Sequence, residues 1–167
     1  MRKLSSDTRD DLLLYTLDDQ KLEPFIQTRF TERNATISRD GNWVAYTSDE
    51  TGQREIYVQS FPKLGNKTQV SVGGTGIPTS SRFVRTLWGP NDESIIYLSA
   101  DSRTLFRVPI ETSPTFRVGR PEPLFRLPAG FTSYDSIDGE RFLIAVRASE
   151  TQQLTVVTNW AAELDGR

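Results

Sequence analysis

The 167-residue sequence contains no cysteine and no histidine, and these two absences exclude much of enzyme chemistry. Without histidine there is no imidazole general base, no Ser-His-Asp triad and almost no route to a zinc site. Without cysteine there is no thiol nucleophile, no disulfide and no iron–sulfur ligation. We therefore expect no cofactor and no metal, and the chain could lie in either a reducing or an oxidising compartment.

The sequence also lacks an excess of charge of one sign, because its 20 lysine and arginine residues nearly balance its 22 aspartate and glutamate residues. Such a balance gives no electrostatic footprint for nucleic acid or for an anionic membrane. Long apolar runs are absent too. The run from Phe142 to Val146 is far shorter than the ~20 residues of a membrane helix, and no apolar leader follows the basic start at Met1. We expect neither nucleic-acid binding nor membrane insertion.

What the sequence does contain is internal repetition. Three polar turns, each followed by an apolar run, are centred on Asp40, Asn91 and Asp138, which are 51 and 47 residues apart. A second apolar element recurs four times with spacings of 44, 49 and 49 residues, starting at Leu12, Ile56, Leu105 and Leu154. A third element recurs at Pro24, Gln69 and Pro123. Short runs of Ile, Val, Tyr and Phe bounded by Gly, Pro, Asn or Asp predict strands, and only Trp160–Leu164 offers a short helical pattern.

The Asp40-Gly41 turn is a strong hairpin signal, because both central residues of the favoured two-residue turn have a positive φ. In the second copy Asn91-Asp92 replaces Asp-Gly, and these residue types tolerate the same conformation at some cost. We therefore expect each polar turn to join two antiparallel strands.

The strands Ser94–Leu98 and Phe142–Val146 are nearly continuous apolar runs, which predict sheets covered on both faces. Four strands in a repeat of about 48 residues match the blade of a β-propeller, where each sheet packs between two others. A two-sheet sandwich is the alternative, and it favours clearer alternation of apolar and polar residues. The predicted fold is all-β, with four-stranded antiparallel propeller blades.

The stretch Ser38–Ser48, followed by Ile56–Val58, resembles the TolB-type, WD-like propeller repeat, over roughly residues 10 to 164. Tyr57–Pro62, Gln69–Gly74 and Leu154–Trp160 are similar to the C-terminal propellers of some bacterial serine/threonine kinases. The resemblance implies a non-catalytic binding, sensor or scaffold module in the periplasm or outside the cell, although nothing in the sequence itself sets the compartment. The alternative is a gating propeller of a prolyl-oligopeptidase-like hydrolase. The G-x-S-x-G nucleophile motif is absent, so that hydrolase would carry its catalytic domain elsewhere.

The predicted organisation is a flexible segment at residues 1–9, a partial propeller at residues 10–164 and a tail at residues 165–167. Its repeat units cover approximately residues 10–30, 31–72, 82–127 and 131–160. Named a to d outward from the axis, the strands read c-d, a-b-c-d, a-b-c-d, a-b-c, with the first c strand at Leu12–Leu17 and the last at Leu154–Val157. This makes about three and a half blades.

An arc of this length leaves apolar sheet faces and strand edges uncovered at both ends, which favours association. Our first hypothesis is a head-to-tail homodimer of about six blades, in which the N-terminal c-d strands of one chain complete the last a-b strands of the other. The repeated c strand is a difficulty for this arrangement. The alternatives are a fragment of a longer protein, a small three-blade ring, and a relic kept because it assembles.

We expect the mouth of the ring to bind a ligand, which is either a protein or a small molecule. Arginine dominates the cations, with 16 Arg to 4 Lys, and guanidinium groups recognise carboxylates and phosphates. The predicted ligand-binding residues are Arg33, Arg82, Arg85 and Tyr134. The glycine-rich segment Gly73–Gly76 lacks the spacing of a phosphate-binding loop, so we interpret it as a connection between two blades.

Overall fold

The computed structural model describes residues 10–76, 85–113 and 115–147, and this part of the chain is all-β. Its first six strands are β1 (Leu12–Thr16), β2 (Lys21–Ile26), β3 (Arg33–Ile37), β4 (Trp43–Ser48), β5 (Glu55–Ser60) and β6 (Thr68–Gln69). The others are β7 (Leu87–Trp88), β8 (Ser94–Leu98), β9 (Thr104–Glu111), β10 (Arg117–Val118), β11 (Glu122–Arg126), β12 (Phe131–Asp135) and β13 (Leu143–Val146). A 3₁₀ turn, Pro90–Asp92, is the one helical element within the described ranges.

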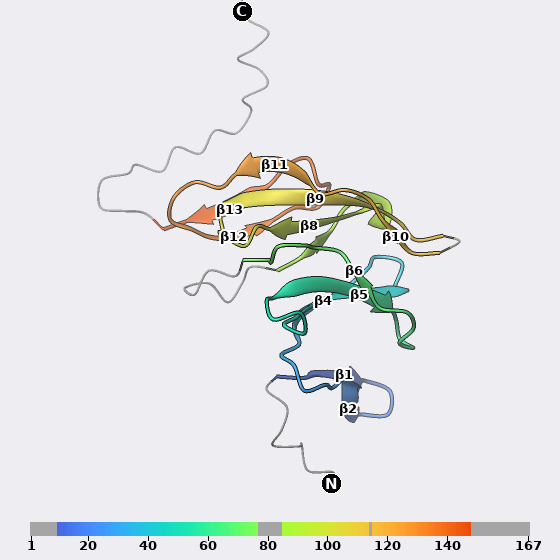
Figure 1. Cartoon of the computed structure of the whole chain (residues 1–167). Helices are drawn as coiled ribbons and strands as arrows, with labels where there is room; N and C mark the ends of the chain where they lie inside the picture. The colour runs from blue at the N-terminus through green and yellow to red at the C-terminus, as the bar shows by residue number, and fades with distance from the viewer. Residues whose placement is uncertain (1–9, 77–84, 114, 148–167) are drawn as a thin grey trace, which may run out of the picture.

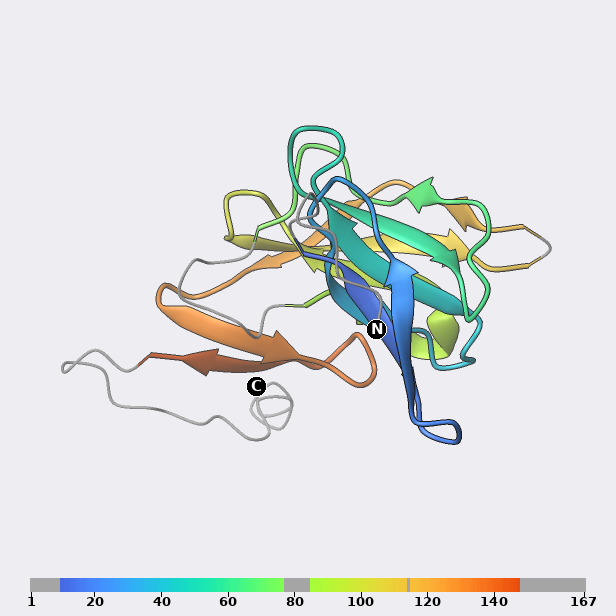
Figure 2. The same ribbon diagram turned by 90° about the horizontal axis from the view of Figure 1, so that it is seen from below.

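The strands form several antiparallel sheets whose members follow one another along the chain. The first complete sheet has the order β3-β4-β5-β6, and the second has β7-β8-β9 with β11 beside β9. The short strand β10 pairs with the far end of β9. The hairpins β1-β2 and β12-β13 are two-stranded. Figure 1 shows the β1-β2 hairpin, the β3–β6 sheet and the second sheet as successive layers, and Figure 2 shows β12-β13 lying beside the second sheet.

The polar turns join the predicted strands, but their geometry differs from the expected form. Only Gly41 of the first turn has a positive φ, of 73°, whereas Asn91 and Asp92 both do, at 52° and 57°. Asp40 caps its own turn instead, since its carboxylate accepts hydrogen bonds from the Ser38 hydroxyl (2.6 Å) and the Asn42 N–H (2.9 Å). These bonds hold the pKa of Asp40 below its usual value. The Asp-Gly signal therefore predicts the hairpin but not the turn type.

Strand β8 is buried on both faces, as its apolar run predicts. Ile95 and Tyr97 pack against the β3–β6 sheet, in one cluster with Ile56. Ile96 and Leu98 point the other way and belong to the cluster that includes residues of β12 and β13. Because side chains alternate along a strand, one apolar run supplies the core on each side of its sheet. The second sheet is therefore an inner layer of the described chain, as the β3–β6 sheet is on its other side.

Equivalent aromatic pairs mark the repeat in three dimensions. Tyr46 on β4 lies opposite Tyr57 on β5, with ring centroids 6.0 Å apart. Tyr97 on β8 lies opposite Phe106 on β9, with centroids 5.7 Å apart. Each pair faces the sheet that precedes it along the chain: Tyr46 and Tyr57 pack with residues of β1-β2, and Tyr97 and Phe106 pack toward β3–β6. The sequence repeat therefore corresponds to a repeated packing contact.

The outer hairpins are buried on their inward faces only. On β1-β2, Phe25 and Ile26 pack inward, while Tyr15 and its cross-strand partner Leu22 are exposed. On β12-β13, Ile144 packs inward, whereas Leu143 is 80% exposed. Within the described residues of a single chain, Phe142–Val146 is therefore covered on one face only, and not on both as its apolar run predicts. The physical reason is that β12-β13 is the outermost layer among the described strands.

A buried carboxylate at the start of β5 organises the connection between the two larger sheets. Glu55 accepts hydrogen bonds from the Gln53 side chain (2.8 Å), the Ser71 hydroxyl (2.5 Å) and the Gly74 N–H (2.8 Å). The chain then crosses to the second sheet, where the Gly76 N–H donates to the Leu98 carbonyl (3.0 Å). A Cβ at position 76 would overlap backbone and side-chain atoms of the second sheet, so this crossing requires glycine.

Asp92 links the polar turns of the two sheets. Its carboxylate is buried and accepts the backbone N–H groups of Arg39 and Asp40, each at 3.0 Å. Arg39 in turn donates to the backbone carbonyl of Ile137, in the turn between β12 and β13. The three predicted turns therefore gather at one end of the molecule.

Several predicted features lie outside the described residues. These are the flexible segment 1–9, the tail 165–167, the last predicted strand Leu154–Val157 and the helical pattern Trp160–Leu164.

Two buried glutamates give a matched stability test. Replacing Glu55→Gln leaves one acceptor oxygen for three donors, so we expect a loss of roughly 1–2 kcal/mol. Glu32 differs, because one oxygen accepts from Thr28 (2.6 Å) and Ser48 (3.2 Å), and the other, also buried, has no hydrogen-bond partner within the described part of the chain. Glu32→Gln removes a buried charge and keeps those two bonds, so its effect should stay within about 0.5 kcal/mol or be stabilising.

Urea unfolding of the two variants at neutral pH measures both effects. Equal losses for Glu32→Gln and Glu55→Gln would contradict this account of the two carboxylates.

Candidate functional site

The predicted ligand-binding residues lie near the place where the first strands of successive sheets meet. Arg33 begins β3, Arg85 precedes β7 and Tyr134 lies in β12. Arg82 lies outside the described residues. The structure brings Arg85 and Tyr134 together, and Arg33 adjoins them only through its neighbour Asn34, which lines the same cavity.

Arg33 and Arg85 are each already paired with a carboxylate. The Arg33 guanidinium contacts the carboxylate of Asp10, and the two residues are about half exposed. The Arg85 guanidinium lies 3.2 Å from Asp135 Oδ2, again with both side chains about half exposed. Exposed ion pairs of this kind contribute little to stability and exchange readily with a competing anion. A ligand at either arginine would have to displace its present partner.

Tyr134 is a core residue in the structure. Its side chain is 3% exposed and packs in the cluster between the second sheet and β12-β13. Its hydroxyl donates to the backbone carbonyl of Arg85 at 2.9 Å. Burial raises the pKa of the phenol above its usual value, since the charged phenolate is poorly solvated there. In this conformation Tyr134 positions Arg85 and is not itself presented to a ligand.

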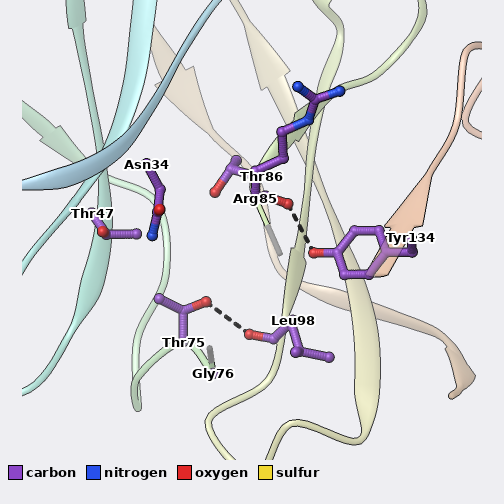
Figure 3. A pocket seen from close by; sticks show the side chains of 8 residues that line it. All are labelled: Asn34, Thr47, Thr75, Gly76, Arg85, Thr86, Leu98 and Tyr134. Atoms are coloured by element: carbon purple, nitrogen blue, oxygen red, sulfur yellow. Dashed lines mark hydrogen bonds between the residues drawn. The ribbon is translucent and has the colours of Figure 1, made fainter. Parts of the chain in front are cut away.

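A small cavity of about 10 Å³ lies beside this hydrogen bond (Figure 3). It is lined by Asn34, Thr47, Thr75, Gly76, Arg85, Thr86, Leu98 and Tyr134. The Asn34 amide nitrogen is buried with no hydrogen-bond partner among the described residues, and its backbone has a φ of 55°. The volume is close to the minimum that holds a single water molecule. The cavity itself is therefore too small for a metabolite or a peptide side chain.

Two larger clefts open on the outside of the layers. One, of about 610 Å³, lies along the turn between β12 and β13 and includes Arg39, Ile137 and Arg141. The other, of about 490 Å³, lies between the turn before β9 and the turn before β12, and includes Arg103, Arg126 and Phe131. Both have volumes in the range of small-molecule sites.

The described residues offer no arrangement for metal or membrane chemistry. Within residues 10–76, 85–113 and 115–147, no three His, Cys, Asp or Glu side chains are grouped so that they could hold a metal ion. No helix in the same part of the chain is long and apolar enough to cross a membrane.

Sequence reasoning missed the polar contacts that shape this region. Asn34 and Thr75 line the cavity, but no local pattern marks them, because their neighbours come from other sheets. Arg103 and Arg126 were not selected either. A signal was present, since Arg126 directly follows the predicted strand that starts at Pro123 and Arg103 lies two residues before the one that starts at Leu105, and adjacent antiparallel strands bring such ends together.

Comparison of the sequence with models of known protein families gives no match, and comparison with curated proteins gives none. The function must therefore be argued from the geometry of the chain itself.

Tyr134→Phe tests the role of the buried phenol. The change removes the hydrogen bond to Arg85 and should cost about 1 kcal/mol at pH 7. Because the folded-state pKa is raised, the wild-type phenol contributes stability that is complete below pH ~10 and is lost as the pH rises through the folded value. The difference between wild type and variant should therefore shrink above pH ~10.

Urea unfolding at pH 7 and pH 10.5 measures that difference. A gap that widens at the higher pH would show that the buried tyrosine does not have this linkage.

Proposed function

We propose that the chain is a non-catalytic, TolB-like β-propeller module that binds a partner or ligand and assembles with a second copy into a closed ring of about six blades. The observation that carries the proposal is the stacking of antiparallel sheets in chain order within the described residues, with a two-stranded hairpin at each end of that part of the chain. A sheet that packs on both of its neighbours is the organising feature of a propeller.

The two end hairpins complement each other. In the repeat, β1-β2 corresponds to β5-β6, the outer half of a four-stranded sheet, and β12-β13 corresponds to β3-β4, the inner half. If β13 of one protomer pairs with β1 of its partner, the two hairpins complete one sheet in the same antiparallel order as β4 and β5. Two such junctions close a ring with C2 symmetry, and they require the predicted last strand, Leu154–Val157, to be displaced or to pair elsewhere.

The exposed apolar side chains fit this junction. Ile37, opposite Val44 on the inner strand of the first sheet, is 51% exposed on the face where β1-β2 covers the outer strands. Leu143 is 80% exposed on the outward face of β12-β13. Closure would set Leu143 against Ile37 of the partner subunit and cover both. The resemblance to exported propellers supports a site of action in the periplasm or outside the cell.

The ligand-binding face of this module is the mouth of the ring. The contacts that support this are the exchangeable ion pairs of Arg33 and Arg85 and the hydrogen bond by which Tyr134 holds Arg85 from the core, while Arg82 falls in the same connection as Arg85 along the sequence. This set favours an acidic partner, because guanidinium groups released from Asp10 and Asp135 present paired donors to a carboxylate.

The solution mass tests the assembly. The wild-type chain should elute as one species of about 38 kDa, twice its 18.9 kDa, in size exclusion with light scattering. Leu143→Glu places a charge in the proposed junction and should give a folded monomer near 19 kDa. Val72→Glu is the matched control, since Val72 is 81% exposed but lies away from either end hairpin.

A well-folded wild-type monomer, or a polydisperse aggregate, would contradict the two-chain ring. The same would follow if Val72→Glu dissociated the dimer as fully as Leu143→Glu.

A further inference from the structure

One cleft of the molecule carries guanidinium groups that no described carboxylate pairs with. It lies between the turn before β9 and the turn before β12, with a volume of about 490 Å³. Arg103 comes from the first turn, and Arg126 comes from the end of β11, whose partner in β9 is Thr104. Arg103 lies opposite Leu127, whose N–H donates to the Arg103 carbonyl at 2.8 Å, so the two arginines occupy successive positions at the end of one sheet and both line the cleft.

The two arginines of this cleft differ from four other arginines of the described chain in having no ion-pair partner. Arg33, Arg85, Arg107 and Arg141 each form an ion pair with a carboxylate. Within the described residues, neither the Arg103 nor the Arg126 guanidinium forms an ion pair or a hydrogen bond. Two guanidinium charges that line one cleft without an ion-pair partner favour the binding of an anion there.

The one acidic residue lining the cleft is committed to its own turn. Asp101 accepts hydrogen bonds from the Ser99 hydroxyl (2.5 Å) and the Arg103 N–H (3.1 Å), both on the same carboxylate oxygen. Its charge interacts with Arg103 and Arg126, but a single carboxylate held in this way balances only one of the two guanidinium charges. The cleft therefore keeps a net positive charge.

The rest of the lining suits a ligand with an anionic group and an apolar body. Leu127 is buried beneath the cleft, the Phe131 ring is half-buried, and Pro128 adds a rigid apolar surface. A further arginine, Arg147, adjoins the rim, because its backbone N–H donates to the Gly130 carbonyl at 2.9 Å. Figure 2 shows the yellow turn before β9 and the orange turn before β12 on the same side of the molecule.

We infer that this cleft binds an oxyanion, with Arg103 and Arg126 as its two guanidinium ligands. The group bound is a phosphate or a carboxylate, because both match the paired N–H donors of arginine. The site is built from one chain and does not include Arg33, Arg85 or Tyr134. The inference is therefore independent of ring closure.

The test is a titration of the full ¹⁵N-labelled chain, followed by the amide signals of Arg103 and Gly130. Inorganic phosphate and succinate are the two probes, and sodium chloride at equal ionic strength is the control for simple screening. We expect saturable shifts confined to the two turns. Arg103→Gln and Arg126→Gln should each weaken the apparent affinity by about fivefold or more.

Arg120→Gln is the matched variant, since Arg120 is an exposed arginine outside the cleft, and it should leave the affinity unchanged. The dispersed spectrum of each variant shows that it is folded. Tighter binding of phosphate assigns the site to phosphorylated ligands, and equal or tighter binding of succinate assigns it to carboxylates. Shifts that rise linearly and equally with chloride, or that persist in both cleft variants, would overturn the inference.

Discussion

The structure depends on sheets that are apolar on both faces. Along β8, alternate side chains supply two different clusters, with Ile95 and Tyr97 on one side and Ile96 and Leu98 on the other. A sheet of this kind cannot rest against water on either face without exposing a large apolar surface. Stacking in chain order follows from this requirement. For the same reason, the exposed apolar faces of the outer hairpins favour association with a further sheet.

Polar groups then determine how the layers are aligned, because apolar packing by itself is not directional. Glu55 holds the glycine-rich crossing against β5, and Asp92 holds the first polar turn against the second. Both carboxylates are buried, and their oxygens accept hydrogen bonds from uncharged N–H and O–H groups of other segments of the chain. Buried polar networks of this kind are costly when incomplete, so they favour a single arrangement of the sheets.

Within the described residues the sequence was sufficient to predict most of the strands, though not β10, because apolar runs, turn residues and the repeat all act locally. The first strand, for example, was expected at Leu12–Leu17 and ends one residue earlier, at Thr16. The contacts of the candidate site were less accessible. Arg85 forms an ion pair with Asp135, which is 50 residues away in the sequence. The Tyr134 hydroxyl donates to the backbone carbonyl of Arg85, and no sequence pattern marks such a carbonyl as an acceptor. Side chains that face each other across two sheets are set by the packing of the layers, which no local pattern encodes.

The central claim is that the outer face of β12-β13 is covered by the first sheet of a second copy. Because the chain has no native cysteine, single cysteines can be placed without background. Chains carrying Ile37→Cys and chains carrying Leu143→Cys are mixed and treated with a short thiol-specific cross-linker. The account predicts an efficient covalent dimer of one chain of each kind and little product from either variant alone. Efficient cross-linking of each variant with itself, or no cross-linking in the mixture of folded chains, would contradict it.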